Sequence, residues 1–192
     1  MAASEVEICN SALLKVGAAR ITSITEDSKM GRVCNVSYNK MRKKLLYSHP
    51  WNFAIRRAAL AQTTNTPSYG YTYEYQVPSD VLRVLDTDLL EGQEWVLENN
   101  EDGDRVILTD YESIKIKYLK DVTDTTDFSP AFDEVLATLI AADIAYSLTG
   151  SRQLSRDLFN QYKEEIREAR SFDAQEGSRE EIEANPWIDV RS

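Results

Sequence analysis

The sequence predicts an α+β, mainly α protein: an antiparallel four-helix bundle with an inserted small antiparallel β-sheet and an extended C-terminal arm. Apolar residues recur every three or four positions in two segments before residue 60 and in two after residue 128, which is the period of an amphipathic helix. Between them, apolar and polar residues alternate, as in strands with one buried face. We therefore expect the bundle over 1–60 and 128–175, a strand-rich insert over 61–127, and the arm over 176–192.

The first helix begins at a recognisable cap. Ser4 and Glu7 have the spacing of a capping box, in which each side chain binds the backbone N–H of the other residue. Gly17 is suited to end this helix. Its apolar stripe consists of Val6, Cys9, Leu13 and Val16.

The second helix begins near residue 27 or 28. It stops at His49-Pro50, because proline disfavours helix in the residue before it. Its apolar stripe consists of Met30, Cys34, Tyr38, Met41 and Leu45.

The insert contains several short strands. Residues 71–77 alternate tyrosine or valine with polar side chains, and residues 114–118 alternate apolar residues with lysines. Further apolar runs occur at 81–85, 95–97 and 105–108. The last two runs flank the turn-rich stretch 99–104, which predicts a β-hairpin.

Two more helices are expected after residue 128. Ser129 is a good N-cap and Pro130 a favourable first residue, while Asp133 and Glu134 suit the positive end of the helix dipole. Gly150 separates this helix from a last one. The apolar stripe of the last helix consists of Leu154, Leu158, Tyr162, Ile166 and Phe172.

The composition excludes several classes of protein. The chain has 192 residues, 42% of them hydrophobic, which suits one compact domain with a real core. It lacks an apolar run of the ~20 residues that a membrane span needs, and its start lacks the basic region of a secretory signal. Two cysteines and one histidine do not make a disulfide framework or a His-based metal site. We expect a protein of a reducing compartment with no metal, no cofactor and no membrane partner.

The net charge of −10 is unevenly distributed. Residues 29–60 carry eight basic groups and no acidic group, whereas residues 61–150 carry five basic and eighteen acidic groups. Such a pattern favours charge pairing within the chain, contact with a partner, or head-to-tail complementarity in a ring. The basic residues that could contact DNA or another subunit are Lys40, Arg42, Lys43, Lys44, Arg56 and Arg57.

Residues capable of catalysis are few. Cys9 and Cys34 lie on apolar stripes, so we expect buried structural thiols rather than nucleophiles. His49 is expected to cap or pack at a helix end; a Ser–His–Asp arrangement stays open, although the chain has no nucleophile-elbow motif. The acidic runs 98–104 and 121–127 lack the spacing of a calcium loop and are expected to be solvated or to contact another subunit.

Four stretches carry a resemblance to a known family. They are 10–17 (NSALLKVG), 38–42 (YNKMR), 45–54 (LLYSHPWNFA) and 75–85 (YQVPSDVLRVL). The chain is similar to the tail tubular protein A family, the head-to-tail adaptors or connectors of short-tailed bacteriophages (podoviruses). The resemblance covers nearly the whole chain, and HPWNFA is its most specific part.

The resemblance implies a non-enzymatic structural virion protein. Members of the family form a ring of twelve copies beneath the portal protein, connect it to the tail nozzle protein, and continue the DNA channel used in DNA ejection. Their bundle and C-terminal arm face the portal, so Trp187, Ile188 and Val190 are the expected portal-binding residues; alternatively, Trp187 packs back onto its own chain. Such a protein is assembled in the host cytoplasm and located at the head–tail junction of the virion.

Two alternatives stay open. Some members of the group have been proposed to hydrolyse glycans, and a glycan-hydrolysing virion enzyme would need an acidic pair in a cleft. The other alternative is a DNA-contacting module that uses the basic segment 29–60, although the acidic remainder of the chain argues against a dedicated DNA-binding protein.

Overall fold

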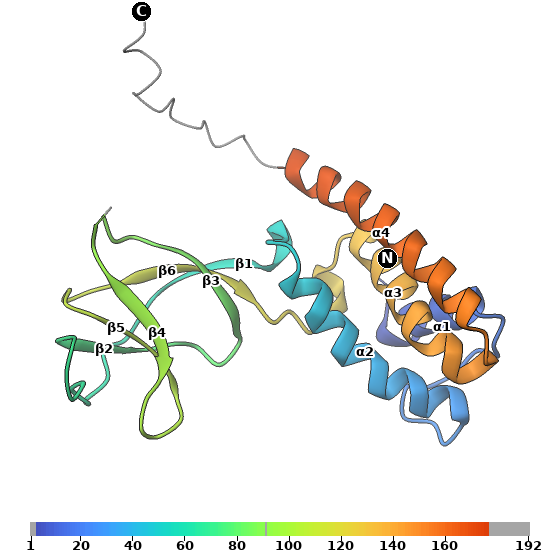
Figure 1. Cartoon of the computed structure of the whole chain (residues 1–192), viewed down its shortest axis with the longest axis horizontal. Helices are drawn as coiled ribbons and strands as arrows, with labels where there is room; N and C mark the ends of the chain where they lie inside the picture. Colours follow the sequence, from blue (N-terminus) through green and yellow to red (C-terminus); the bar gives the residue numbers. More distant parts are fainter. Residues whose placement is uncertain (1–2, 91, 177–192) are drawn as a thin grey trace, which may run out of the picture.

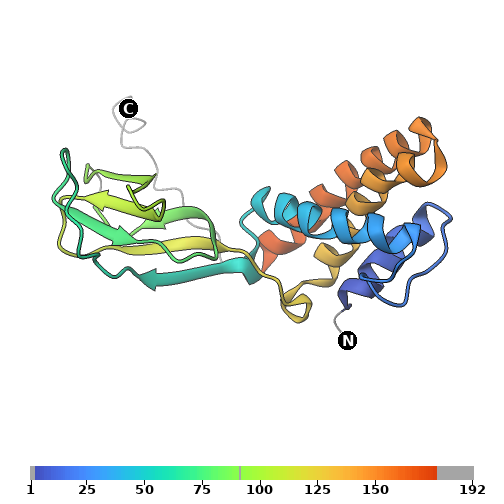
Figure 2. The same cartoon turned by 90° about the horizontal axis from the view of Figure 1, so that it is seen from below.

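The computed structural model describes residues 3–90 and 92–176. Within them the helices are α1 (Glu5–Lys15), α2 (Lys29–Tyr47), α3 (Pro130–Thr149) and α4 (Arg152–Gln175). The strands are β1 (Ile55–Ala59), β2 (Tyr73–Gln76), β3 (Val81–Thr87), β4 (Trp95–Asn99), β5 (Arg105–Thr109) and β6 (Lys115–Lys120). Figures 1 and 2 show the strands together at one end of an elongated molecule and the helices at the other. None of the described helices is both long and apolar enough to cross a bilayer.

The prediction of an antiparallel four-helix bundle is wrong. α3 lies at the centre of the helical part and packs against α4, α1 and α2, while α1 and α2 contact each other much less. The cause is the composition of α3, in which every residue from Val135 to Ala142 is buried. A helix without a continuous polar face takes the centre, and the other helices cover it. The mixture of helices and antiparallel strands is compatible with the α+β class.

The described strands form two three-stranded antiparallel sheets instead of one small sheet. The first has the order β1-β6-β3 and the second the order β2-β5-β4. β1 lies within residues 1–60, a range that the sequence predicts to be helical. The strand is not predicted because its sequence IRRAA lacks a clear alternation of apolar and polar residues. The hairpin predicted around residues 99–104 is confirmed, since β4 and β5 pair up to Asn99 and Arg105.

The predicted helix starts that depend on capping residues are confirmed. The N–H of Ser4 donates to the Glu7 carboxylate at 2.7 Å, and the N–H of Glu7 donates to Ser4 Oγ at 3.2 Å. Ser129 Oγ accepts from the N–H of Phe132 at 3.3 Å and begins α3. α3 ends at Thr149 and is capped by Gly150, whose φ of 71° lies in the left-handed region that favours glycine.

Two apolar clusters stabilise the fold. The first lies among the helices and includes Leu119 and Val122 from the end of the strand part. The second lies among the strands and includes Ile107 and Ile116. Because β6 contributes residues to both clusters, it couples the packing of the strands to that of the helices.

Candidate functional site

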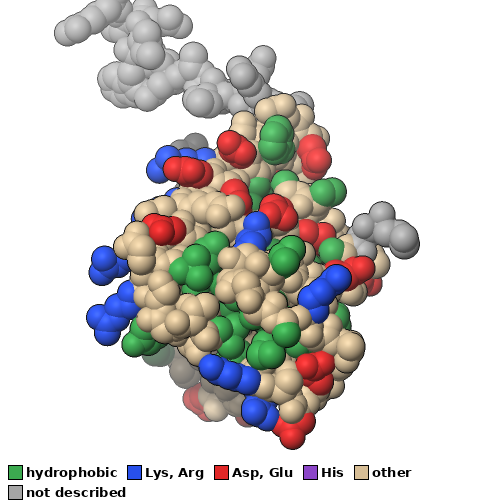
Figure 3. Space-filling model, turned by 90° about the vertical axis from the view of Figure 1, so that its right-hand side faces the viewer, with side chains coloured by type: hydrophobic (Ala, Val, Ile, Leu, Met, Phe, Trp, Pro, Cys, Tyr) green, Lys and Arg blue, Asp and Glu red, His purple; other side chains and the backbone are tan. Residues whose placement is uncertain are grey.

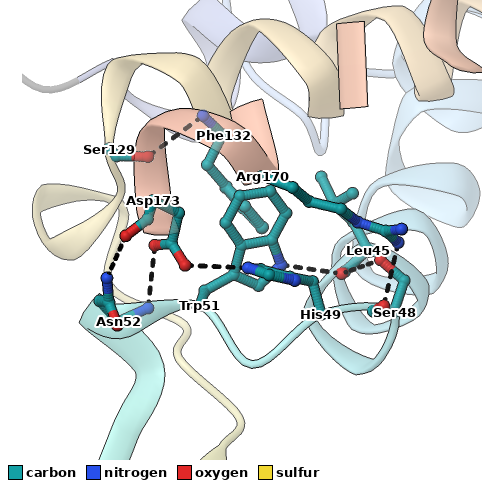
Figure 4. A network of polar contacts seen from close by, with 9 residues as sticks. All are labelled: Leu45, Ser48, His49, Trp51, Asn52, Ser129, Phe132, Arg170 and Asp173. Carbon is teal, nitrogen blue, oxygen red and sulfur yellow. Dashed lines mark hydrogen bonds and ion pairs between the residues drawn. The ribbon is translucent and has the colours of Figure 1, made fainter. Parts of the chain in front are cut away.

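The HPWNFA segment, residues 49–54, connects α2 to β1 and is held by the last turn of α4 (Figure 4). One carboxylate oxygen of Asp173 accepts the backbone N–H of Asn52 at 3.0 Å, and the other lies 2.9 Å from Nε2 of His49. The side-chain amide of Asn52 donates to the backbone carbonyl of Asp173. Asp173 is 8% exposed, so these contacts are largely shielded from water. We call His49, Trp51, Asn52 and Asp173 the junction clamp.

The indole of Trp51 anchors the clamp in the helical core. Trp51 is fully buried, and its Nε1–H donates to the carbonyl of Leu45 at 3.0 Å. Its ring lies edge-on to Phe132, with ring centroids 5.2 Å apart. The ring of Phe132 also packs against Phe53 and Phe128, with centroid distances of 5.1 and 4.8 Å. Each such aromatic pair contributes about 0.5–1.5 kcal/mol beyond the area that it buries. The aromatic residues of the segment therefore fix it to the start of α3.

The clamp is not arranged as a Ser–His–Asp triad. Ser48, the serine next to His49, donates its hydroxyl to the carbonyl of Leu45 at 2.8 Å, and its own carbonyl accepts from Arg170 at 3.0 Å. The imidazole of His49 packs edge-on against Trp51, with centroids 4.8 Å apart. The prediction that His49 packs at a helix end is confirmed, and the residue also connects the end of α2 to α4.

Arg42 forms a second connection between helices and strands. Its side chain is 2% exposed, and its guanidinium donates to the carboxylate of Asp121 and to the carbonyl of Val122. Lys43 contacts the same carboxylate at 3.0 Å. Burial alone would raise the pKa of Asp121, but the hydrogen bonds from these two cations outweigh it and hold the pKa below its usual 3.8. The burial of Arg42 corrects its assignment as a residue that could contact DNA or another subunit.

The other predicted basic residues lie on two elements. Lys40, Lys43 and Lys44 are exposed on α2, where Lys40 lies 3.5 Å from Asp143. In β1, Arg57 is exposed, whereas the half-buried Arg56 donates to backbone carbonyls of Phe53 and Ile55 and lies 3.7 Å from Asp127. On the end of the helical part that faces away from the strands, basic side chains are scattered around apolar ones instead of forming a continuous patch (Figure 3).

The acidic run 98–104 covers the end of β4 and the turn before β5, and the run 121–127 connects β6 to α3. Residues 98–102 line a cavity of about 600 Å³ together with the exposed ring of Tyr69. Glu74, also in the cavity wall, is 5% exposed and accepts hydrogen bonds from Thr63 and Asn100, so its carboxylate holds two loops together. Over residues 3–90 and 92–176, no group of three or more His, Cys, Asp or Glu side chains is placed to hold a metal ion.

Cys9 and Cys34 are buried, as the sequence predicts. A hydrogen bond with Cys34, together with burial among apolar residues, raises the pKa of the Cys9 thiol above its usual value of 9.0. The same hydrogen bond lowers the pKa of the Cys34 thiol, but neither cysteine side chain is exposed, so the pair contributes packing rather than chemistry.

The predicted portal-binding residues Trp187, Ile188 and Val190 lie outside the described residues. Comparison with protein-family models and with curated proteins finds no match for this chain. Function is therefore inferred from the residues and their arrangement.

Sequence reasoning missed Asp173 and Asn52. It placed Asp121 in a run expected to be solvated or to contact another subunit, whereas Asp121 is largely buried and pairs with Arg42 of the same chain. A signal for Asp173 was present, because it occupies the next position of the buried stripe that contains Ile166 and Ala169. An acidic residue on an apolar stripe indicates a buried donor opposite it. Asn52 and Asp121 lie in connections, where no period marks which side chain is turned inward.

Proposed function

We propose that the chain is a head-to-tail adaptor of a short-tailed bacteriophage, a structural virion protein that assembles as a ring under the portal protein. The observation that carries the proposal is the position of HPWNFA, the most specific part of the resemblance. This segment joins α2, β1 and α4 through Trp51 and Asp173. A closed ring requires every subunit to have the same shape, and the junction clamp fixes the helical part relative to the strand part.

The shape of the molecule supports the proposal. The helices and strands lie at opposite ends of an elongated chain, so one subunit has separate surfaces for two different partners (Figures 1 and 2). We assign the helical end and the arm to the portal protein and the strand end to the tail nozzle protein.

The charge distribution supports a ring with a channel. α2 carries six basic residues and no acidic one, whereas residues 61–150 carry eighteen acidic groups and five basic groups. Part of this charge is paired within the subunit, because Lys40, Arg42 and Lys43 contact Asp143 and Asp121. The remaining opposite charges favour a heterologous contact between copies, which closes into a ring. Acidic surface along the channel would repel passing DNA and let it slide.

The proposal is tested by ordered binding. Purified portal rings are mixed with the tail nozzle protein, with and without this chain, and separated on a density gradient. The proposal expects the nozzle protein to migrate with the portal only when this chain is present. Equal migration of the nozzle protein with the portal in its absence would contradict an adaptor role.

A further inference from the structure

A groove runs over α3 between α2 and α4. The hydroxyl of Ser37 on α2 donates to Asp143 of α3 at 2.8 Å, and the hydroxyl of Ser155 on α4 donates to the carbonyl of Ala142 at 2.8 Å. The two helices are thus fixed to α3, and Figure 1 shows α2 and α4 on opposite sides of it. The groove has a volume of about 170 Å³ and is lined mainly by Met41, Lys44, Leu139, Ala142 and Phe159.

The groove presents an aromatic side chain to solvent. Phe159 is 40% exposed although it lines the groove. Tyr162 stacks on it, with centroids 5.7 Å apart, and Lys163 Nζ lies 4.8 Å from its ring centroid. An exposed aromatic ring held rigidly in a groove is typical of a surface that receives an apolar anchor.

Lysines lie in or beside the groove on both of its sides. Lys44 lines it from α2, Lys40 lies one turn earlier on the same helix, and Lys163 lies over Phe159 on α4. Asp143 contributes one acidic group to the lining and lies 3.5 Å from Lys40. The occupant expected from these contacts is a segment with apolar side chains and a net negative charge.

We propose that residues 177–192 of the same chain bind in this groove, with Trp187 against Phe159. The segment carries four acidic and two basic residues around its apolar side chains Ile182, Trp187, Ile188 and Val190. The net negative charge of the segment is opposite to that of the lysines around the groove, and its apolar side chains match the apolar lining.

The length of the chain allows this contact. Phe159 and Gln175 are sixteen residues apart on α4, a distance of about 24 Å along the helix axis. Trp187 follows Gln175 by twelve residues, which span up to about 40 Å when extended. The segment can therefore turn back and reach the groove of its own subunit. If residues 177–192 also bind the portal, the portal must displace them from this groove, so arm release would accompany assembly.

The proposal is tested by measuring lysine reactivity in the full-length chain. Wild type and Trp187→Ala are acetylated with an N-hydroxysuccinimide ester, and the rate at each lysine is followed by mass spectrometry. Lys44 is expected to react about threefold more slowly in the wild type, because the bound segment covers it for most of the time. Lys43, the adjacent residue, is 56% exposed and contacts Asp121 instead of lining the groove, so its rate is the matched control.

A second measurement identifies the occupant. A mixture of ¹⁴N- and ¹⁵N-labelled chains is treated with a carbodiimide, which joins Lys44 to a carboxylate of residues 180–189 by an amide bond. Cross-linked peptides of a single isotope are expected if the segment belongs to the same chain. Peptides that combine both isotopes would overturn the proposal in favour of a second copy, and equal Lys44 rates in the two proteins would overturn it altogether. Neither measurement needs the portal, so their failure leaves the adaptor proposal standing.

Discussion

Replacing Asp173 with alanine tests the junction clamp directly. The substitution removes the acceptor of the Asn52 N–H at 3.0 Å and the partner of His49 Nε2 at 2.9 Å. A hydrogen bond to a charged acceptor contributes about 1.5–3 kcal/mol, and the half-buried His49 recovers part of this from water. We therefore expect the free energy of unfolding to fall by about 2–3 kcal/mol, which lowers Tm by roughly 5–10 °C for a chain of this size.

The assay is urea unfolding followed by far-UV circular dichroism, with Asp157→Ala as the matched control. Asp157 lies exposed on the same helix and accepts a hydrogen bond from the exposed Gln153, so its loss is expected to cost less than about 0.5 kcal/mol. If Asp173→Ala lost no more stability than Asp157→Ala, the clamp would not hold the junction, and the structural reasoning behind the proposed function would fail.

Three further substitutions test other parts of the fold. Gly31→Ala should destabilise by about 1–3 kcal/mol, measured by urea unfolding, because its Cβ would lie 2.5 Å from the carbonyl oxygen of Glu26; an increase in stability would contradict that close approach. Arg42→Met should lower the free energy of unfolding by about 3–5 kcal/mol, whereas Lys43→Met should lower it by less than about 1 kcal/mol, because only Arg42 is buried where it pairs with Asp121. Equal losses in the two variants would contradict this reasoning. Burial raises the pKa of Asp133 to about 6 from 3.8, so this carboxyl group stays protonated to a higher pH in the folded protein than in the unfolded chain. The free energy of unfolding therefore falls as pH rises between these values. Asp133→Asn should therefore stabilise at pH 7.5 by about 1 kcal/mol, after allowance for solvent screening, with the gain disappearing near pH 3.5.

The helix termini were predictable because capping is local. Ser4 with Glu7, and Ser129 before its helix, carry the whole signal within four residues, and the structure confirms both. The hairpin between β4 and β5 was predictable for the same reason, since its turn residues lie together in the sequence.

The arrangement of helices and sheets depends on contacts between distant residues. The even apolar composition of α3 indicates burial but does not say that the other helices surround it. β1 was not predicted because its two adjacent arginines interrupt the alternation of apolar and polar residues. It forms a strand because it pairs with β6, some sixty residues later in the chain. Arg42 likewise reads as part of a basic surface, and only the position of Asp121 explains its burial.

The most direct test of the adaptor account is the mass of the complex with the portal. Light scattering is measured for this chain alone, for purified portal rings, and for their mixture. The account predicts that the portal gains about 260 kDa, corresponding to a ring of twelve chains of 21.9 kDa each. A portal mass that stays unchanged in the mixture would contradict the adaptor proposal and would favour an activity at the acidic cavity beside Tyr69.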